Sequence, residues 1–369
     1  MSPRHSKDSA TGSEQRIPSK DMPPLPTNFL PVFFRNQFRT TIELPTAEAY
    51  PDVHGKCALV TGANTGLGFE SAAQLLSLGL SRLVMAVRSL EKGEVAASKL
   101  RAANPSATID VWQLDMESYE SIQSFVHKCE SLPRIDVAIL NAGISPMHFA
   151  TVPATGHERT MQVNHMSTVL LALLLLPVLK GKSSGAPPRL TVVNSVMAHL
   201  CSFPNRDERP LLASFDDTSV TPFNSSERYG VSKLLCQLAL VRLADMVDPE
   251  AITINMVDPG LTKGTGLSRD ATGIVRLLAG AFLSICGRPV ARGAATYVDA
   301  ALRHGTESHG CFLMNCEVAG VVRAGLDGNH GRAQVRWGRA GNRLGSKTEM
   351  KTMIKETPSR DELIKSSVM

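Results

Sequence analysis

The segment CALVTGANTGLGFESAAQLLSLGL, residues 57–80, constrains the fold more than any other part of the chain. It consists of a short apolar run over 57–61, a turn, and an amphipathic stretch over 67–78. The turn contains three glycines, Gly62, Gly66 and Gly68. Glycines here let the backbone turn sharply and approach a pyrophosphate, whose charge is favoured at the positive N-terminus of the following helix. Glycine triplets also occur in purely structural turns, but this place between a strand and a helix predicts a dinucleotide-binding site.

After residue 55, short β-branched runs alternate with longer helical stretches, which is typical of a parallel sheet covered on both faces. Strands are predicted over residues 57–61, 82–87, 108–113, 135–140, 190–194, 252–257 and, more weakly, 311–314. Helices are predicted over residues 67–78, 91–103, 118–130, 157–179, 227–246 and 290–303. We therefore predict an α/β fold: a Rossmann-like, doubly wound, seven-stranded parallel sheet in a three-layer αβα arrangement, as one catalytic domain over residues 55–318.

The two ends differ from this domain in composition. Residues 1–26 are rich in Ser, Pro and Lys, which favours disorder, and residues 27–52 suggest an arm that packs on the domain without regular structure. We therefore expect residues 1–54 to be a disordered or extended N-terminal arm. Residues 319–369 carry frequent glycines, many arginines and no apolar period, so a poorly ordered basic tail is expected, either divergent or an error in the gene assignment.

Charge, cysteines and hydropathy exclude several classes of protein. The net charge of +5 comes largely from the two ends, which indicates solvated tails and no nucleic-acid partner. Seven cysteines without a C-x-x-C pair indicate reduced thiols and no metal site. The apolar runs at 169–176 and 274–286 are shorter than the roughly 20 residues of a membrane-spanning helix. We expect a cytoplasmic protein, with peripheral membrane contact through 274–286 as the alternative to a core or substrate-cavity helix.

The end of the second predicted strand bears on the choice of cofactor. An acid there would bind the ribose 2′-hydroxyl of NAD, but the sequence VMAVRSLE places Arg88 after the strand. A guanidinium can pair bidentately with the 2′-phosphate of NADP, so NADP is favoured, the alternative being a solvated arginine. Asp115, after the third strand, would face the adenine amino group. Asn141, with Ala142 and Gly143, would lie under the adenosine ribose, although either site could be an ordinary turn.

The sequence ERYGVSK places Tyr229 and Lys233 four residues apart, hence on one face of a predicted helix. A tyrosine is a poor acid or base at neutral pH because its pKa is about 10. A nearby ammonium group favours the phenolate and is expected to lower that pKa. The Tyr-x-x-x-Lys spacing occurs by chance in many helices, so its weight comes from its position after the fifth strand of the same predicted sheet.

The motifs TGANTGLG, LNAG, RYGVSK and VDPGLTKGTGL occur in this order over about residues 55–318. In this they resemble classical-type short-chain dehydrogenases/reductases. The segments FFRNQFRTTIELPT, LLASFDDTS and SHGCFLMNCEVAG are similar to those of the retinol-dehydrogenase-like branch, especially fungal reductases of secondary metabolism. The resemblance implies hydride transfer between NADP and a carbonyl or alcohol.

The same resemblance implies the role of each site residue. Tyr229 would give a proton to a carbonyl or take one from an alcohol, Lys233 would tune Tyr229 and hold the cofactor, and Asn164 would anchor a water in a proton relay. The implied cofactor-binding residues are Gly62, Asn64, Gly66, Leu67, Gly68, Arg88, Asp115, Asn141, Tyr229, Lys233 and Thr262.

The end of the fifth predicted strand departs from the family pattern. The family usually has two consecutive hydroxyl residues there, and Asn194 replaces the first. The carbonyl-orienting hydroxyl could then fall on Ser195, or its place could be taken by Val196. A register without an insertion inside the strand places it on Ser195, and an insertion would reverse the facing of every residue after it.

Residues 196–228 mix apolar side chains with few charges near the expected catalytic end, which predicts a hydrophobic substrate. The residues expected to cover it are Phe203, Leu211, Leu212, Phe215 and Phe223. An NADPH-dependent reductase of a polyketide or terpenoid ketone is the main hypothesis. The alternatives are an NADP-dependent alcohol dehydrogenase of retinoid-like or steroid-like substrates and a non-catalytic NADP sensor. The sequence leaves open whether the protein is a homo-oligomer.

Overall fold

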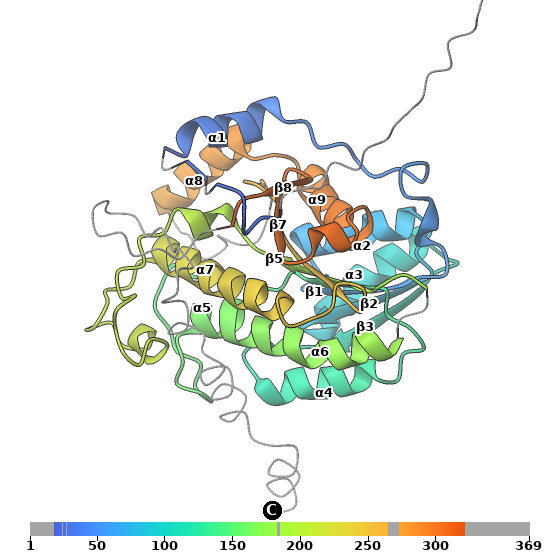
Figure 1. The fold of residues 1–369 in the computed structure, drawn as a ribbon, viewed down its shortest axis with the longest axis horizontal. Helices are drawn as coiled ribbons and strands as arrows, with labels where there is room; N and C mark the ends of the chain where they lie inside the picture. The colour runs from blue at the N-terminus through green and yellow to red at the C-terminus, as the bar shows by residue number, and fades with distance from the viewer. Residues whose placement is uncertain (1–17, 24, 27, 183–184, 265–272, 322–369) are drawn as a thin grey trace, which may run out of the picture.

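An eight-stranded sheet with the strand order β3-β2-β1-β4-β5-β6-β7-β8 forms the centre of the computed structural model (Figure 1). The structure describes residues 18–23, 25–26, 28–182, 185–264 and 273–321. The strands are β1 (Cys57–Thr61), β2 (Arg82–Val87), β3 (Thr108–Gln113), β4 (Val137–Leu140), β5 (Arg189–Val193), β6 (Thr253–Asp258), β7 (Cys311–Met314) and β8 (Glu317–Ala319). The first seven pair in parallel, which confirms the predicted doubly wound sheet.

Two layers of helices cover the two faces of the sheet. The principal helices are α2 (Gly66–Ser77), α3 (Leu90–Ala103), α4 (Tyr119–Cys129), α6 (Thr168–Lys182), α7 (Ser225–Ala244), α8 (Gly273–Cys286) and α9 (Val290–Leu302). Successive side chains of β1 point to opposite faces, so Leu59 packs with α4, α6 and α7, whereas Val60 packs with α2, α3 and α9. Because both faces are covered, the central strands are apolar at nearly every position.

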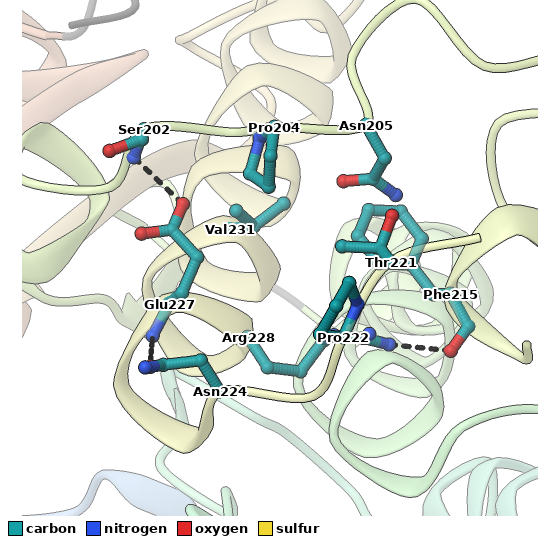
Figure 2. Close-up of a pocket in the computed structure, with 10 residues that line it drawn as sticks. All are labelled: Ser202, Pro204, Asn205, Phe215, Thr221, Pro222, Asn224, Glu227, Arg228 and Val231. Atoms are coloured by element: carbon teal, nitrogen blue, oxygen red, sulfur yellow. Dashed lines mark hydrogen bonds between the residues drawn. The ribbon is translucent and has the colours of Figure 1, made fainter. Parts of the chain in front are cut away.

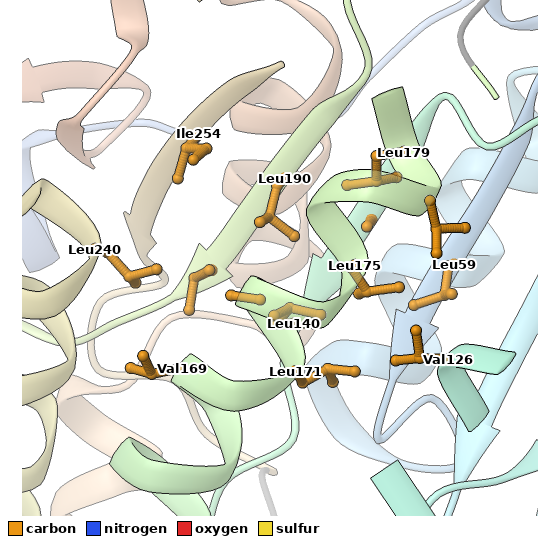
Figure 3. Packing of buried hydrophobic residues seen from close by; sticks show 14 of the residues in the cluster. Leu59, Val126, Leu140, Val169, Leu171, Leu175, Leu179, Leu190, Leu240 and Ile254 are labelled. Carbon is orange, nitrogen blue, oxygen red and sulfur yellow. The ribbon is translucent and has the colours of Figure 1, made fainter. Parts of the chain in front are cut away.

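Helix α6 provides much of the core on one face. Leu171, Leu175 and Leu179 point from it toward Leu59 and Leu140 of the sheet (Figure 3). The continuous helical run Arg159–Lys182, which includes α6, is long and apolar enough to cross a membrane, and 72% of its most apolar window is buried inside the molecule. In the described part of the chain this helix is therefore packed as a core helix.

The eighth strand was not predicted. Strand β8 pairs antiparallel with β7 through a two-residue turn at Asn315 and Cys316, which have φ angles of 55° and 65°. Two consecutive residues with positive φ are typical of the tight turns that join hairpin strands. The ordered chain therefore continues past the expected boundary at residue 318, while residues 322–369 of the expected tail lie outside the described residues.

The N-terminal arm is more ordered than expected. Residues 30–39, expected to lack regular structure, form α1 (Leu30–Phe34) and a π-helical turn, η1 (Arg35–Arg39). The hydroxyl of Ser19 is buried and accepts a hydrogen bond from the backbone N–H of Phe312 in β7, at 2.9 Å. The correction has a physical reason: contacts with distant parts of the domain order this segment, and local composition does not report them. Residues 1–17 lie outside the described residues.

Candidate active site

The predicted site residues gather at the carboxyl ends of β1, β4, β5 and β6, on one edge of the sheet. In the strand order, β1 and β4 are neighbours, and the chain leaves them toward opposite edges of the sheet. Ligands of open α/β sheets bind at such a switch point, outside the carboxyl ends of the strands.

The glycine turn after β1 has the backbone shape that the sequence predicts. Gly62 and Gly66 have φ angles of 65° and 58°, in the left-handed region that favours glycine. A Cβ atom on Gly68 would lie 2.5 Å from Asn141 Nδ2 and from the carbonyl oxygen of Gly62, so no larger residue fits there. Thr65 precedes α2 without a side-chain cap. This uncapped helix N-terminus beside a close-packed glycine turn fits a pyrophosphate.

Four further predicted cofactor residues lie in or near this region. Asn141 Nδ2 donates to the carbonyl oxygen of Thr61 at 2.8 Å and thereby joins the ends of β4 and β1. Asp115 Oδ1 accepts the backbone N–H of Glu117 at 3.0 Å, so it braces the turn after β3. Asn64 lies in the glycine turn, and Leu67 lies at the start of α2.

Arg88 follows β2, and its side chain is 61% exposed. Its Nη1 atom lies 3.1 Å from Glu117 Oε1, which also accepts hydrogen bonds from Nε and Nη2 of Arg159 at 2.8 and 2.7 Å. Two guanidinium groups thus meet one carboxylate, which leaves a net positive charge at the end of β2. Sequence reasoning missed Glu117 and Arg159, because Arg159 lies far from Arg88 along the chain.

Ser195 lies two residues after the end of β5, and its neighbours differ from those of Val196. Its hydroxyl is hydrogen-bonded to that of Tyr229, whereas the backbone N–H of Val196 donates to Asp258 Oδ1 at 3.0 Å. Asn194, which replaces the usual first hydroxyl residue, donates from Nδ2 to the carbonyl oxygen of Lys233 at 3.2 Å. Its Oδ1 accepts the N–H of Ser195 at 2.7 Å, so Asn194 ties the strand end to α7.

Tyr229 and Lys233 lie on one face of α7 beside the strand ends, Lys233 buried and Tyr229 partly buried. Lys233 Nζ donates to the carbonyl oxygen of Val193 at 2.8 Å and lies 5.8 Å from the centre of the Tyr229 ring. Burial raises the pKa of Tyr229 well above its ordinary value of 10.0, and the hydrogen bond from Ser195 lowers it only in part. Burial also lowers the pKa of Lys233. The rise in the pKa of Tyr229 is opposite in direction to the expected lowering, and desolvation is its largest cause.

Asn164 joins the same cluster from an irregular helix. The predicted helix over 157–179 is divided into α5 (Arg159–Met161), a π-helical segment, η3 (Gln162–Ser167), and α6. Asn164 Oδ1 accepts the N–H of Ile144 at 2.9 Å, and its Nδ2 donates to the carbonyl oxygen of Ile144 and to Ser232 Oγ. A Cβ on Gly143 would lie 3.2 Å from Asn164 Oδ1 and 3.6 Å from Lys233 Nζ, so these groups converge on one turn. Irregular π turns are frequent at functional sites.

Gln37, in the N-terminal arm, contacts the loop that carries the predicted cofactor residue Thr262, and sequence reasoning missed it. Its Nε2 donates to the carbonyl oxygens of Leu261 and Cys286 at 2.8 and 2.7 Å, and its Oε1 accepts the N–H of Leu261 at 3.2 Å. Thr262 is next to this clamp, and its hydroxyl donates to the carbonyl oxygen of Gly260 at 3.1 Å. The arm thus fixes the backbone next to Thr262, which is predicted to contact the cofactor.

Arg288 supports the same loop from within. Its side chain is buried, and its Nη2 donates to the carbonyl oxygen of Asn36 and to Asn315 Oδ1, both at 2.9 Å. A Cβ on Gly260, where φ is 70°, would lie 2.7 Å from Arg288 Cζ. The sequence offers no local signal for this contact, because Arg288 lies between two helices without a motif.

A cavity of about 290 Å³ opens on the other face of α7 (Figure 2). Its wall includes Glu227 and Val231, which a helical turn of 3.6 residues places away from Tyr229. Phe215 also borders it and stacks on Phe203 at 6.3 Å, both rings being buried in a hydrophobic cluster with Val231. The two rings pack the segment before α7 onto that helix.

Comparison with known proteins agrees with this geometry. The sequence profile of the short chain dehydrogenase family matches residues 56–201. Short chain dehydrogenase/reductase mfmJ of Annulohypoxylon moriforme is 49% identical over 305 residues, 82% of this chain and 88% of that protein. Short chain dehydrogenase virL of Hypocrea virens is 42% identical over 283 residues, 76% of this chain and 81% of that protein.

Solved structures of short-chain dehydrogenases share this fold. A short-chain dehydrogenase from Sphingobium yanoikuyae, in complex with NADPH, superposes with a TM-score of 0.50 at 17% identity, over 66% of this chain and 82% of that one. At this identity the likeness concerns the fold alone. The two fungal relatives decide the family: the chain is a short-chain dehydrogenase/reductase, an oxidoreductase of the family that uses NAD(P).

Proposed function

We propose that the protein is an NADPH-dependent reductase of a ketone or aldehyde in a hydrophobic small molecule, such as a polyketide or terpenoid intermediate of secondary metabolism. The observation that carries the proposal is the Tyr229 hydroxyl, hydrogen-bonded to Ser195, with Lys233 Nζ 5.8 Å from the centre of the Tyr229 ring. The phenol is protonated at neutral pH, so it can donate a hydrogen bond to the carbonyl oxygen and give its proton as negative charge develops there. Oxidation of an alcohol would instead need the phenolate as the base.

The residues of the chain divide the work of carbonyl reduction. Ser195 and Tyr229 both bind the substrate carbonyl oxygen, and Tyr229 gives its proton to that oxygen as negative charge develops. Asn194 and Lys233 hold the two hydroxyl groups in place through the strand end and α7. Asn164 places its amide beside the 143–144 turn and Ser232, where a water relay from Lys233 would return the proton to Tyr229.

The cofactor residues support NADP as the partner. When bound, NADPH supplies the hydride that reduces the carbonyl carbon. The N-terminus of α2 and the glycine turn would hold the pyrophosphate, and Thr262 would contact the nicotinamide. Arg88 pairs with the 2′-phosphate, since an exposed ion pair with Glu117 contributes only about 0–1 kcal/mol and yields readily to a doubly charged group. Arg159 then keeps Glu117 neutralised.

A panel of carbonyl compounds tests the proposal. Purified protein is incubated with NADPH and either aromatic or polycyclic ketones or phosphorylated sugars, and the loss of NADPH and the alcohol products are measured. Turnover of hydrophobic ketones that depends on NADPH supports the proposal. Turnover of the sugars alone would contradict the hydrophobic substrate, and NADPH binding without turnover of any carbonyl would favour a sensor.

A further inference from the structure

The N-terminal helix and α8 run side by side on the outside of the domain (Figure 1). The rings of Phe33 and Phe282 are stacked with their centres 6.5 Å apart, and Gln37 Nε2 donates to the carbonyl oxygen of Cys286 at 2.7 Å. These contacts lie four residues apart on each helix, so the two helices run in the same direction with matched turns. The pair therefore forms one continuous outer surface.

This surface exposes large apolar side chains. Leu30, Phe34 and Phe38 are spaced four residues apart and are 61%, 52% and 51% exposed. On α8, Phe282 and Ile285 are 52% and 76% exposed. We call these five residues the apolar face. Single exposed apolar residues are ordinary on a protein surface, whereas a contiguous group marks an interaction site.

Ring contacts show that the apolar face is contiguous. Phe38 stacks on Phe34 at 5.7 Å, Phe34 meets Phe33 edge-on at 5.9 Å, and Phe33 stacks on Phe282. The aromatic rings thus form an unbroken row from η1 across α1 to α8. Packing among themselves does not remove these rings from water, since three of them stay about half exposed.

The charges beside the apolar face indicate what covers it. Arg35 and Arg39 are exposed and lie one residue after Phe34 and Phe38, and residues 28–42 contain no acidic side chain. Aromatic residues on one side of a helix with arginines beside them are typical of helices that lie in the interface of an anionic membrane. A second copy of the chain would bring the same arginines toward each other, which opposes a symmetric pairing.

We propose that the apolar face binds the surface of an anionic lipid bilayer, with the phenylalanine rings at the boundary between headgroups and acyl chains and with Arg35 and Arg39 on the lipid phosphates. The protein then rests on the membrane without crossing it. Because Gln37 joins the same helix to Leu261, the bound membrane lies beside the loop that carries Thr262. The proposal does not depend on which carbonyl compound the enzyme reduces.

Sedimentation of the full-length protein with lipid vesicles tests the proposal. The vesicles contain phosphatidylcholine alone or with about one third phosphatidylserine. The wild type is expected to sediment with the anionic vesicles and much less with the neutral ones. Replacing both rings, Phe34→Ser with Phe38→Ser, should weaken binding about tenfold or more, because two half-exposed rings no longer enter the lipid. Arg35→Gln with Arg39→Gln should remove the preference for phosphatidylserine.

Matched controls separate this effect from a change in folding. Val95→Ser alters a side chain that is 61% exposed on α3 and should bind vesicles like the wild type. Every variant should keep the wild-type thermal midpoint and NADPH affinity. A wild type that stays in solution with anionic vesicles would overturn the proposal. So would a dimer in solution that the double phenylalanine variant dissociates, because the apolar face would then be a subunit interface.

Discussion

Replacing Arg88 should weaken NADPH binding selectively. The guanidinium lies at the end of β2 with 61% of its side chain exposed, paired with Glu117 at 3.1 Å. A hydrogen bond to a charged group contributes about 1.5–3 kcal/mol, and the competing exposed ion pair is worth about 0–1 kcal/mol. The midpoints of these two ranges differ by about 1.8 kcal/mol, which predicts that Arg88→Ala raises the Kd of NADPH roughly twentyfold. The Kd of NADH should change less than about twofold, because NADH lacks the 2′-phosphate.

Isothermal titration calorimetry measures both affinities without knowledge of the substrate. Arg242→Ala is the matched control, since Arg242 is also a partly exposed arginine paired with a carboxylate, Asp245, but lies near the end of α7. Salt should weaken NADPH binding to the wild type more than to Arg88→Ala. Equal losses of NADPH and NADH affinity, or no loss for either, would refute the assignment of Arg88 to the phosphate.

Variants at three other positions test the site, its support and the core. Ser195→Ala should lower kcat about a hundredfold to a thousandfold with NADPH binding unchanged, as measured in parallel by turnover and titration; near-normal turnover would place the carbonyl donor elsewhere. Gln37→Ala should raise KM more than it lowers kcat, since it frees the Leu261 backbone. Gln37→Glu should raise KM almost as much, because a carboxylate cannot donate a hydrogen bond to the carbonyl oxygen of Cys286. An unchanged KM in both variants would rule out the clamp. Burial lowers the pKa of His165 to about 4 from 6.5. As the pH falls below 6.5, His165 therefore takes up a proton in the unfolded chain before it does so in the folded protein. The free energy of unfolding is expected to fall by about 2 kcal/mol between pH 7 and pH 5. Urea unfolding of His165→Leu should show a smaller loss over that range; an identical loss would contradict the burial argument.

Local patterns predicted the sheet well. The strands β1, β2, β3 and β7 have the predicted bounds, because a short apolar run bounded by turns identifies a buried strand without tertiary information. The prediction of Ser195 as the carbonyl-orienting residue also rests on a local argument, since an insertion inside a strand would turn every later side chain to the other face. The assignment of Tyr229 and Lys233 to one helix face needed only their spacing.

Features that depend on distant contacts were not predictable. The helix over residues 30–39 is held in place by contacts of Gln37 with Leu261 and of Phe33 with Phe282. Leu261 and Phe282 are both far from this helix in the sequence. The pKa of Tyr229 depends on how far α7 is buried, and spacing alone suggested the opposite direction. The burial of Phe203 in the core likewise follows from the path of the chain before α7, whereas the sequence shows only an apolar residue in a loop.

Transfer of deuterium from labelled NADPH tests the central claim most directly. The protein is incubated with a hydrophobic ketone and with NADPH carrying deuterium at the hydride position, and the alcohol product is examined by mass spectrometry. The account predicts one deuterium on the new carbinol carbon with the wild type. It predicts at least about a hundredfold less product with Tyr229→Phe, which still binds NADPH with wild-type affinity. Unlabelled alcohol from the wild type, or undiminished product from Tyr229→Phe, would contradict reduction by hydride transfer with Tyr229 as the proton donor.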